Sequence, residues 1–129
     1  MTDKIGFGRT VPLAFDKAVE RVTEELGREG FGVLTQIDVA ATLKSKLGID
    51  FPAYRILGAC NPQLAHRALQ IEPLVGLLLP CNVVVRADES GTRVEFMDPE
   101  AVLALTDKPG VREVAGEAKT RLQRVCAAL

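Results

Sequence analysis

The sequence contains few of the residues that carry out the chemistry of common enzymes. Among 129 residues there are one histidine, three cysteines, one tyrosine and no tryptophan. It has no phosphate-binding glycine loop, no Gly-x-Ser-x-Gly turn and no His-Glu-x-x-His zinc motif. We therefore assign no catalytic residue, no metal ligand and no cofactor, and leave open whether the protein is an enzyme.

The sequence also lacks a surplus of charge. Sixteen Lys and Arg side chains face 17 Asp and Glu, a net charge of −1, which leaves no basic surface excess for nucleic acid or an anionic membrane. Apolar runs are far shorter than the roughly 20 residues that a membrane span needs. The odd number of cysteines, without disulfide-framework spacing, favours a reduced compartment. We expect a soluble, cytoplasmic protein that binds neither nucleic acid nor membrane.

The length and the hydrophobic pattern predict a single α+β domain over residues 1–129. Apolar side chains recur at helical spacing after Phe15, until Gly30 ends the helix, and again from Val111 to Leu129. Two long amphipathic helices packed on one largely antiparallel sheet form a two-layer fold. The expected strands are Lys4–Thr10, Phe31–Asp38, Tyr54–Cys60, Cys81–Asp88 and Thr92–Met97.

Two short helices are expected between these strands. Asp38 caps the first, whose Leu43 and Leu47 are predicted to point inward before Gly48 ends it. Asn61 caps the second and Pro62 suits its first position.

Faces and register are predicted as well. In the second strand, Phe31, Val33 and Ile37 are placed on one face. A two-residue loop at Ser90-Gly91 would set Arg86 opposite Glu95 and Val85 opposite Phe96, so that one face of the hairpin is charged and the other is core.

Several ordered motifs resemble a known family: Gly30-Phe31-Gly32-Val33-Leu34, Asp38-Val39-Ala40-Ala41-Thr42-Leu43-Lys44, Tyr54-Arg55-Ile56-Leu57-Gly58-Ala59-Cys60-Asn61-Pro62 and Gly76-Leu77-Leu78-Leu79-Pro80-Cys81-Asn82-Val83-Val84-Val85. Over about Phe15 to Pro99 the chain resembles the bacterial and archaeal domain-of-unknown-function family numbered 302. The resemblance implies a β-α-β(4)-α fold like that of the TATA-binding protein and a tendency to form homodimers. It implies no established activity.

The candidate site residues gather between the third and fourth strands: Tyr54, Cys60, Asn61, His66, Cys81 and Asn82. Cys60 and Cys81 are read either as small core residues or as a thiol pair, for redox exchange or a soft metal, with His66 as a third group. His66 on a polar helical stripe also fits a solvated residue. In the antiparallel arrangement that the resemblance implies, we expect the two cysteines to be buried neighbours within roughly 10 Å, without a disulfide.

The Leu74–Leu79 run has three readings: a buried turn, a dimer contact or the wall of a small apolar pocket. Together with the nearly all-apolar Tyr54–Cys60 strand and Ile49–Phe51, it offers more apolar surface than one layer of helices can cover, which predicts a homodimer. Two functional hypotheses follow. The first is a homodimeric binding domain that uses the sheet face or the Leu74–Asn82 region to hold a partner or a small ligand near Tyr54–Asn82. The alternative is a thiol-dependent redox or metal-handling protein that uses Cys60 and Cys81.

Overall fold

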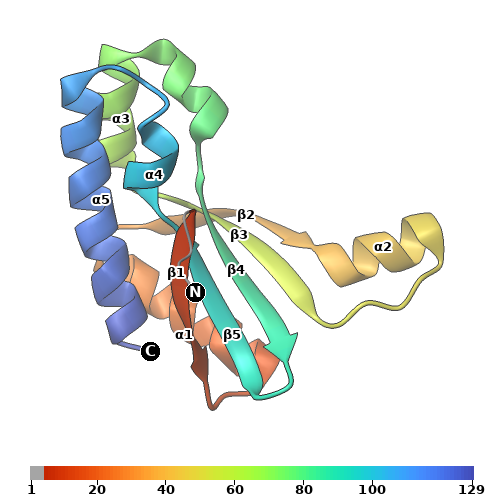
Figure 1. Cartoon of the computed structure of the whole chain (residues 1–129). Coiled ribbons are helices and arrows are strands. Elements are labelled where there is room, and N and C mark those ends of the chain that lie inside the picture. Colours follow the sequence, from red (N-terminus) through yellow and green to blue (C-terminus); the bar gives the residue numbers. More distant parts are fainter. Residues whose placement is uncertain (1–4) are drawn as a thin grey trace.

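A computed structural model describes residues 5–129 and shows one five-stranded antiparallel sheet with long helices on one face (Figure 1). The strand order is β1-β5-β4-β3-β2. Helices α1 (Phe15–Arg28) and α5 (Pro109–Ala127) pack on that face. The order β-α-β(4)-α with short helical insertions confirms the predicted two-layer α+β fold. The strands are β1 (Gly6–Val11), β2 (Gly32–Asp38), β3 (Tyr54–Cys60), β4 (Cys81–Asp88) and β5 (Gly91–Met97).

The insertions lie between neighbouring strands or before α5. Helix α2 (Val39–Leu47) joins β2 to β3, and α4 (Pro99–Leu103) precedes α5. Between β3 and β4 come α3 (Pro62–Ile71) and the 3-10 helix η1 (Pro73–Leu78). None of the helices in residues 5–129 is long and apolar enough to cross a membrane.

The core lies between the sheet and the helices because alternate strand residues point toward α1 and α5. The inward residues of β4 and β5 are almost completely buried, as are the apolar stripes of both long helices. These residues are Val83, Val85, Val94, Phe96, Val22, Leu26, Val111, Leu122 and Val125. Gly30, at φ +84°, ends α1 in the left-handed conformation, as predicted.

The prediction for the faces of β2 is wrong because the strand contains a bulge. The pairing register with β3 shifts between Val33 and Thr35, so Leu34 is an extra residue. Val33 lies opposite Ala59 on the helix-covered face, whereas Ile37 lies opposite Ile56 on the other face and is 50% exposed. One inserted residue has reversed the alternation along the strand.

The predicted hairpin register is off by two residues. Arg86 pairs with Arg93 and Val84 with Glu95, because the loop is formed by Glu89 and Ser90 and β5 begins at Gly91. An even shift keeps every side chain on its predicted face. The division of the hairpin into a charged face and a core face is therefore retained.

The prediction that Leu47 points inward is also wrong, whereas Leu43 is half-buried. Helix α2 begins and ends as expected, with Asp38 as its cap and Gly48 in the left-handed conformation. No residue of α2 is buried, however, and Leu47 is 66% exposed. Figure 1 shows why: α2 projects beyond the ends of β2 and β3, at the right of the view, where no core lies beneath it.

Candidate functional site

The sheet has a second face, which we call the open face, that no helix of residues 5–129 packs across. The pairing register places on it alternate residues of all five strands. Its centre is apolar, and the part nearest the β4–β5 loop carries the charged side chains Arg86, Arg93 and Glu95. The residues are Gly6, Gly8, Thr10, Thr35, Ile37, Tyr54, Ile56, Gly58, Asn82, Val84, Arg86, Arg93, Glu95 and Met97.

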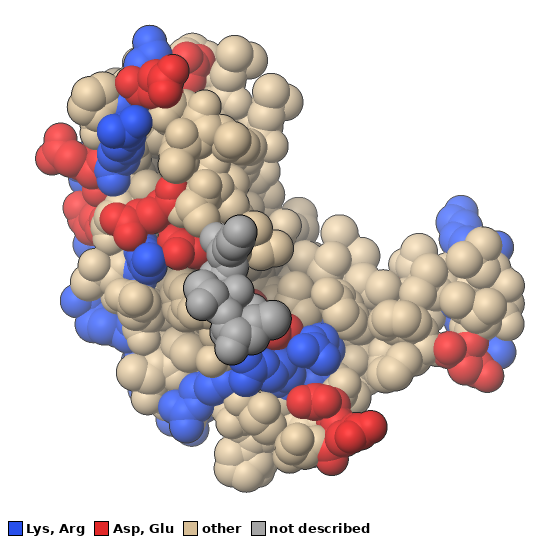
Figure 2. Space-filling view, viewed as in Figure 1, with Lys and Arg blue, Asp and Glu red and all other residues tan. Residues whose placement is uncertain are grey.

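A hollow of about 470 Å³ lies over the open face of β4 and β5 and reaches the end of the sheet beside α4, where Phe7, Phe96 and Val102 border it. That volume falls within the range of small-molecule sites, which are mostly apolar with a few convergent polar groups. Tyr54, Asn82 and Glu95 supply the polar side chains. Figure 2 shows largely uncharged surface between the body of the molecule and the projecting α2. The lining residues are Ile5, Gly6, Phe7, Tyr54, Asn82, Val84, Glu95, Phe96, Met97 and Val102.

The polar edge of the hollow is held by an arginine–carboxylate cluster. Arg86 donates from Nε to Glu95 Oε1 at 2.8 Å, and Arg93 donates from Nε to Glu95 Oε2 at 3.4 Å. The hydrogen bond from Arg86 is the main reason that the pKa of Glu95 lies below its ordinary value, against the opposing effect of burial. Glu95 is therefore ionised at neutral pH and already bonded, which suits it to shape the site rather than to act as a base.

An aromatic pair links the hollow to the segment that projects from the sheet. The rings of Phe51 and Tyr54 meet edge to face, with centroids 6.0 Å apart. Tyr54 lines the hollow, whereas Phe51 precedes β3 and is 43% exposed. A displacement of the segment before β3 would consequently move the ring of Tyr54, which lines the hollow.

The cysteines lie elsewhere, at the other end of β3. Cys81 pairs with Ala59 across the antiparallel β3–β4 ladder, so Cys60 and Cys81 are close neighbours, as predicted. Both are free thiols, Cys81 buried and Cys60 only half-buried. They border a cavity of about 30 Å³, the volume that one water molecule occupies in the liquid.

This environment makes the thiols poor nucleophiles. Burial, with a smaller effect of nearby Cys60, raises the pKa of Cys81 to about 11, and burial also raises the pKa of Cys60. A reactive cysteine needs a depressed pKa, because the thiolate is the nucleophile. Within residues 5–129 there is also no group of three or more His, Cys, Asp or Glu placed to hold a metal ion.

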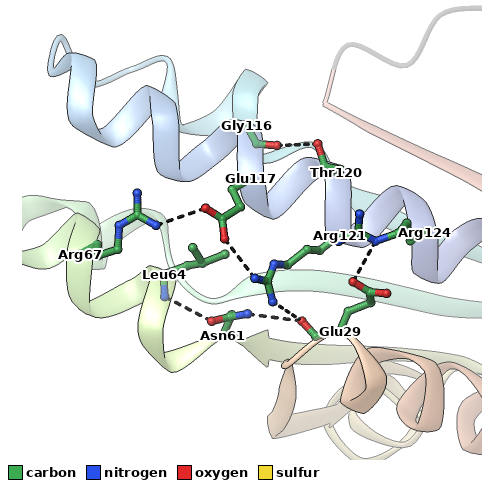
Figure 3. A network of polar contacts seen from close by, with 9 residues as sticks. All are labelled: Glu29, Asn61, Leu64, Arg67, Gly116, Glu117, Thr120, Arg121 and Arg124. Atoms are coloured by element: carbon green, nitrogen blue, oxygen red, sulfur yellow. Dashed lines mark hydrogen bonds and ion pairs between the residues drawn. The ribbon is translucent and has the colours of Figure 1, made fainter.

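Asn61 stands at the centre of a structural network (Figure 3). Its Oδ1 accepts from Leu64 N at 3.2 Å, which caps α3, while its Nδ2 donates to the Glu29 carbonyl at 3.4 Å. Arg121 of α5 donates to the same carbonyl at 3.1 Å and to Glu117 Oε2 at 3.1 Å. The buried amide thus joins the end of α1, the start of α3 and α5.

The six residues singled out in the sequence fall into three groups. Tyr54 and Asn82 line the hollow on the open face. Cys60, Asn61 and Cys81 lie together at the small cavity. His66 is exposed on α3 and lines neither space.

Sequence reasoning missed most of the hollow, above all Val84, Glu95 and Met97. The signal was present in the strand alternation, which separates Val84 from the buried Val83 and Val85. The sheet face was one of the two places considered for a ligand, but these residues were not selected, because the outer face of a hairpin is ordinarily solvent-exposed.

Comparisons with known proteins agree on the family. The model of the family described as "Domain of unknown function DUF302" matches residues 7–129. A crystal structure described as an uncharacterized conserved DUF302 protein from Bacillus stearothermophilus is 34% identical, with a TM-score of 0.89. The alignment covers 95% of this chain and 96% of that one. A search of curated proteins found no match.

Proposed function

Because the chain belongs to the DUF302 family, whose description assigns no activity, we propose a function from its own geometry: a homodimeric binding domain that holds a small, mainly apolar molecule on the open face. The hollow of about 470 Å³ is the observation that carries this proposal. It combines an apolar floor with few polar groups, as small-molecule sites do.

The chemistry of the lining residues indicates the kind of ligand. Val84 and Met97 favour a compact apolar body, and Met adapts to irregular shapes. The Asn82 amide can donate and accept hydrogen bonds, and so can the Tyr54 hydroxyl. Glu95 is already bonded to two arginines. We therefore propose a neutral ligand with one polar group rather than an organic cation.

The proposal can be tested with indole, a compact apolar ring with one N–H donor. Titration of ¹⁵N-labelled protein should shift the amide signals of Tyr54, Asn82, Val84 and Met97 in a saturable way. Val84→Phe should weaken binding by about tenfold or more, because it fills the hollow and costs at least roughly 1.4 kcal/mol of binding free energy. Gln123→Phe, at an exposed position of α5, is the matched control.

Either of two results would contradict the ligand proposal. Indole could fail to give saturable shifts at millimolar concentration, or its shifts could centre on η1 rather than on the open face. Native mass spectrometry of freshly purified protein would report in addition any molecule retained from the cell.

Dimerisation is supported by the apolar side chains that remain exposed. Among the described residues, large apolar groups lie at the surface of α2 and the segment after it, with Leu47 at 66%, Ile49 at 45% and Phe51 at 43% exposure. Exposed apolar surface of this kind marks contact regions. Light scattering at micromolar concentration should give twice the chain mass, and a mass of 13.9 kDa would contradict the dimer.

The thiol-dependent alternative receives no comparable support. The raised pKa values of Cys60 and Cys81 keep both thiols protonated at neutral pH. Their cavity has room for little more than a water molecule. No specific feature of the site therefore favours redox or metal chemistry.

A further inference from the structure

The segment 39–53, which we call the arm, contains a helix without enough packing of its own. Helix α2 has nine residues, and none is buried. Helices shorter than about 12 to 15 residues are marginal in water unless an apolar face packs on something else. Its principal contact is with β3 beside it, at the base of the arm. The arm therefore requires a surface that the body of the same chain does not supply.

The arm carries apolar side chains suited to such a surface. Leu47 is 66% exposed, Ile49 45% and Phe51 43%, and Ile37 at the root of the arm is 50% exposed. Burial of a large aliphatic or aromatic side chain contributes about 1.5 to 3 kcal/mol relative to full exposure. The arm therefore exposes an apolar surface suited to a protein contact, although it also carries two lysines and Asp50.

The open face differs from the arm in shape, because it contains a hollow whereas the arm projects. Its hollow lies mainly over β1, β5 and β4, while the arm leaves the sheet from β2 and β3 and points away from it (Figure 1). Figure 2 shows the arm as a projection from the body of the molecule. The arm thus stands clear of the hollow of its own chain.

We propose that a second copy of this chain covers the open face, each arm lying over the hollow of its partner. The inference rests on the proposed function, because it names what closes the proposed ligand site. A two-fold axis brings both arm-to-face contacts into one self-complementary interface. The arm and the residues that line the hollow together number about 25, within the 20 to 30 per side of a standard interface.

The Phe51–Tyr54 contact couples the two functions of this surface. Phe51 belongs to the arm, and its ring contacts Tyr54, which lines the hollow of the same chain. Seating the arm on a partner consequently fixes one wall of its own ligand site while it closes the partner's site. By linkage, whatever factor pairing adds to the affinity for ligand, the ligand adds to the affinity for the partner.

The test compares aspartate substitutions at three exposed leucines. Leu47→Asp in the arm should reduce the mass from light scattering from twice 13.9 kDa to 13.9 kDa at micromolar concentration. Leu77→Asp in η1 and Leu105→Asp after α4 should leave the pair intact. All three leucines are at least 66% exposed, so none of the changes removes a core side chain.

A second measurement detects the contact without any substitution. In a mixture of ¹³C-labelled and unlabelled protein, isotope-filtered NOEs should connect methyl groups of Leu47 or Ile49 with those of Val84 or Met97. An unsubstituted chain that stays monomeric would overturn the inference. So would a pair that only Leu77→Asp breaks, or one whose intermolecular NOEs arise at η1.

Indole titration separates this inference from the ligand proposal. If Leu47→Asp yields monomers that bind indole about tenfold more weakly at the open face, both proposals hold. If indole binds equally well to both forms, ligand binding stands and closure by the arm is wrong. If Leu47→Asp abolishes pairing while indole never binds, the interface stands and the ligand proposal is wrong.

Discussion

Helices α2 and α3 have similar caps and lengths but differ in how far the rest of the molecule buries them. Each follows a strand and is capped by an Asp or Asn side chain: Asp38 Oδ1 accepts from Ala41 N at 2.9 Å, and Asn61 Oδ1 from Leu64 N at 3.2 Å. They are nearly equal in length, nine and ten residues. Local sequence therefore starts both helices by the same device.

Their surroundings are what differ. Helix α3 buries Leu64 and Ala68, and Arg67 pairs with Glu117 of α5 at 3.2 Å. Helix α2 buries nothing in residues 5–129 of a single chain. The comparison teaches that caps decide where a short helix begins, whereas burial decides whether the fold depends on it.

The largest test of this difference truncates one leucine in each helix. Leu64→Ala should lower the free energy of unfolding by about 2 to 5 kcal/mol, because it opens a cavity between α3 and the core. Leu47→Ala should change it by no more than about 0.5 kcal/mol at protein concentrations low enough to give monomers. Urea titration at two protein concentrations separates folding from pairing. Equal losses in the two variants would erase the distinction.

The stability of the protein at alkaline pH tests whether water reaches Cys81, which lies beside α3. The pKa of Cys81 is about 11 in the folded protein against 9.0 as the ordinary value, so the folded state favours the protonated thiol. The stability that this preference gives is fully present below pH 9 and is lost as pH rises toward 11, by about 2 to 3 kcal/mol.

The control for this titration is the same substitution at a second cysteine, Cys126. Other groups titrate in the same window, so the expected result is a difference between variants. Cys81→Ala should flatten the dependence of unfolding free energy on pH between 9 and 11, and Cys126→Ala, at a half-buried position, should largely retain it. An unchanged slope in Cys81→Ala would show that water reaches the thiol.

The smallest expected effect concerns the caps themselves. Asn61→Ala should cost about 1 to 2 kcal/mol of unfolding free energy, and Asp38→Ala only about 0.5 kcal/mol, because helix α2 can fray without disturbing the core. Asn61→Asp keeps the cap acceptor but replaces the donor to the Glu29 carbonyl with a carboxylate oxygen, so it tests that contact together with the added charge. In Asp38→Ala, hydrogen exchange should quicken in α2 alone; faster exchange in β3 as well would contradict this.

Much of the fold was predictable because it depends on local periodicity. A few adjacent residues are enough to predict the apolar stripes of α1 and α5, the cap of α3 and the left-handed conformation of Gly30. The faces of β2 were not, because nothing local marks Leu34 as the residue left unpaired. The inward direction given to Leu47 failed for a related reason: apolar spacing predicts a stripe on one face of a helix without saying whether a core lies beneath that face.

The candidate site was predictable only in part. Tyr54 and Asn82 were selected for their position around an unusual strand, and both line the hollow. Cys60 and Cys81 were selected for their chemistry, which burial suppresses through their raised pKa values. Side-chain type indicates what a residue can do in water, whereas the surrounding protein decides which protonation state is populated.

The bulge in β2 has a consequence for solubility. Strand β2 forms one border of the sheet, and a regular border strand presents a row of free N–H and C=O groups that can recruit a strand from another molecule. The extra residue at Leu34 interrupts that row, and α2 follows directly after the strand. Growth of the sheet from chain to chain into an open filament is thereby hindered at this border.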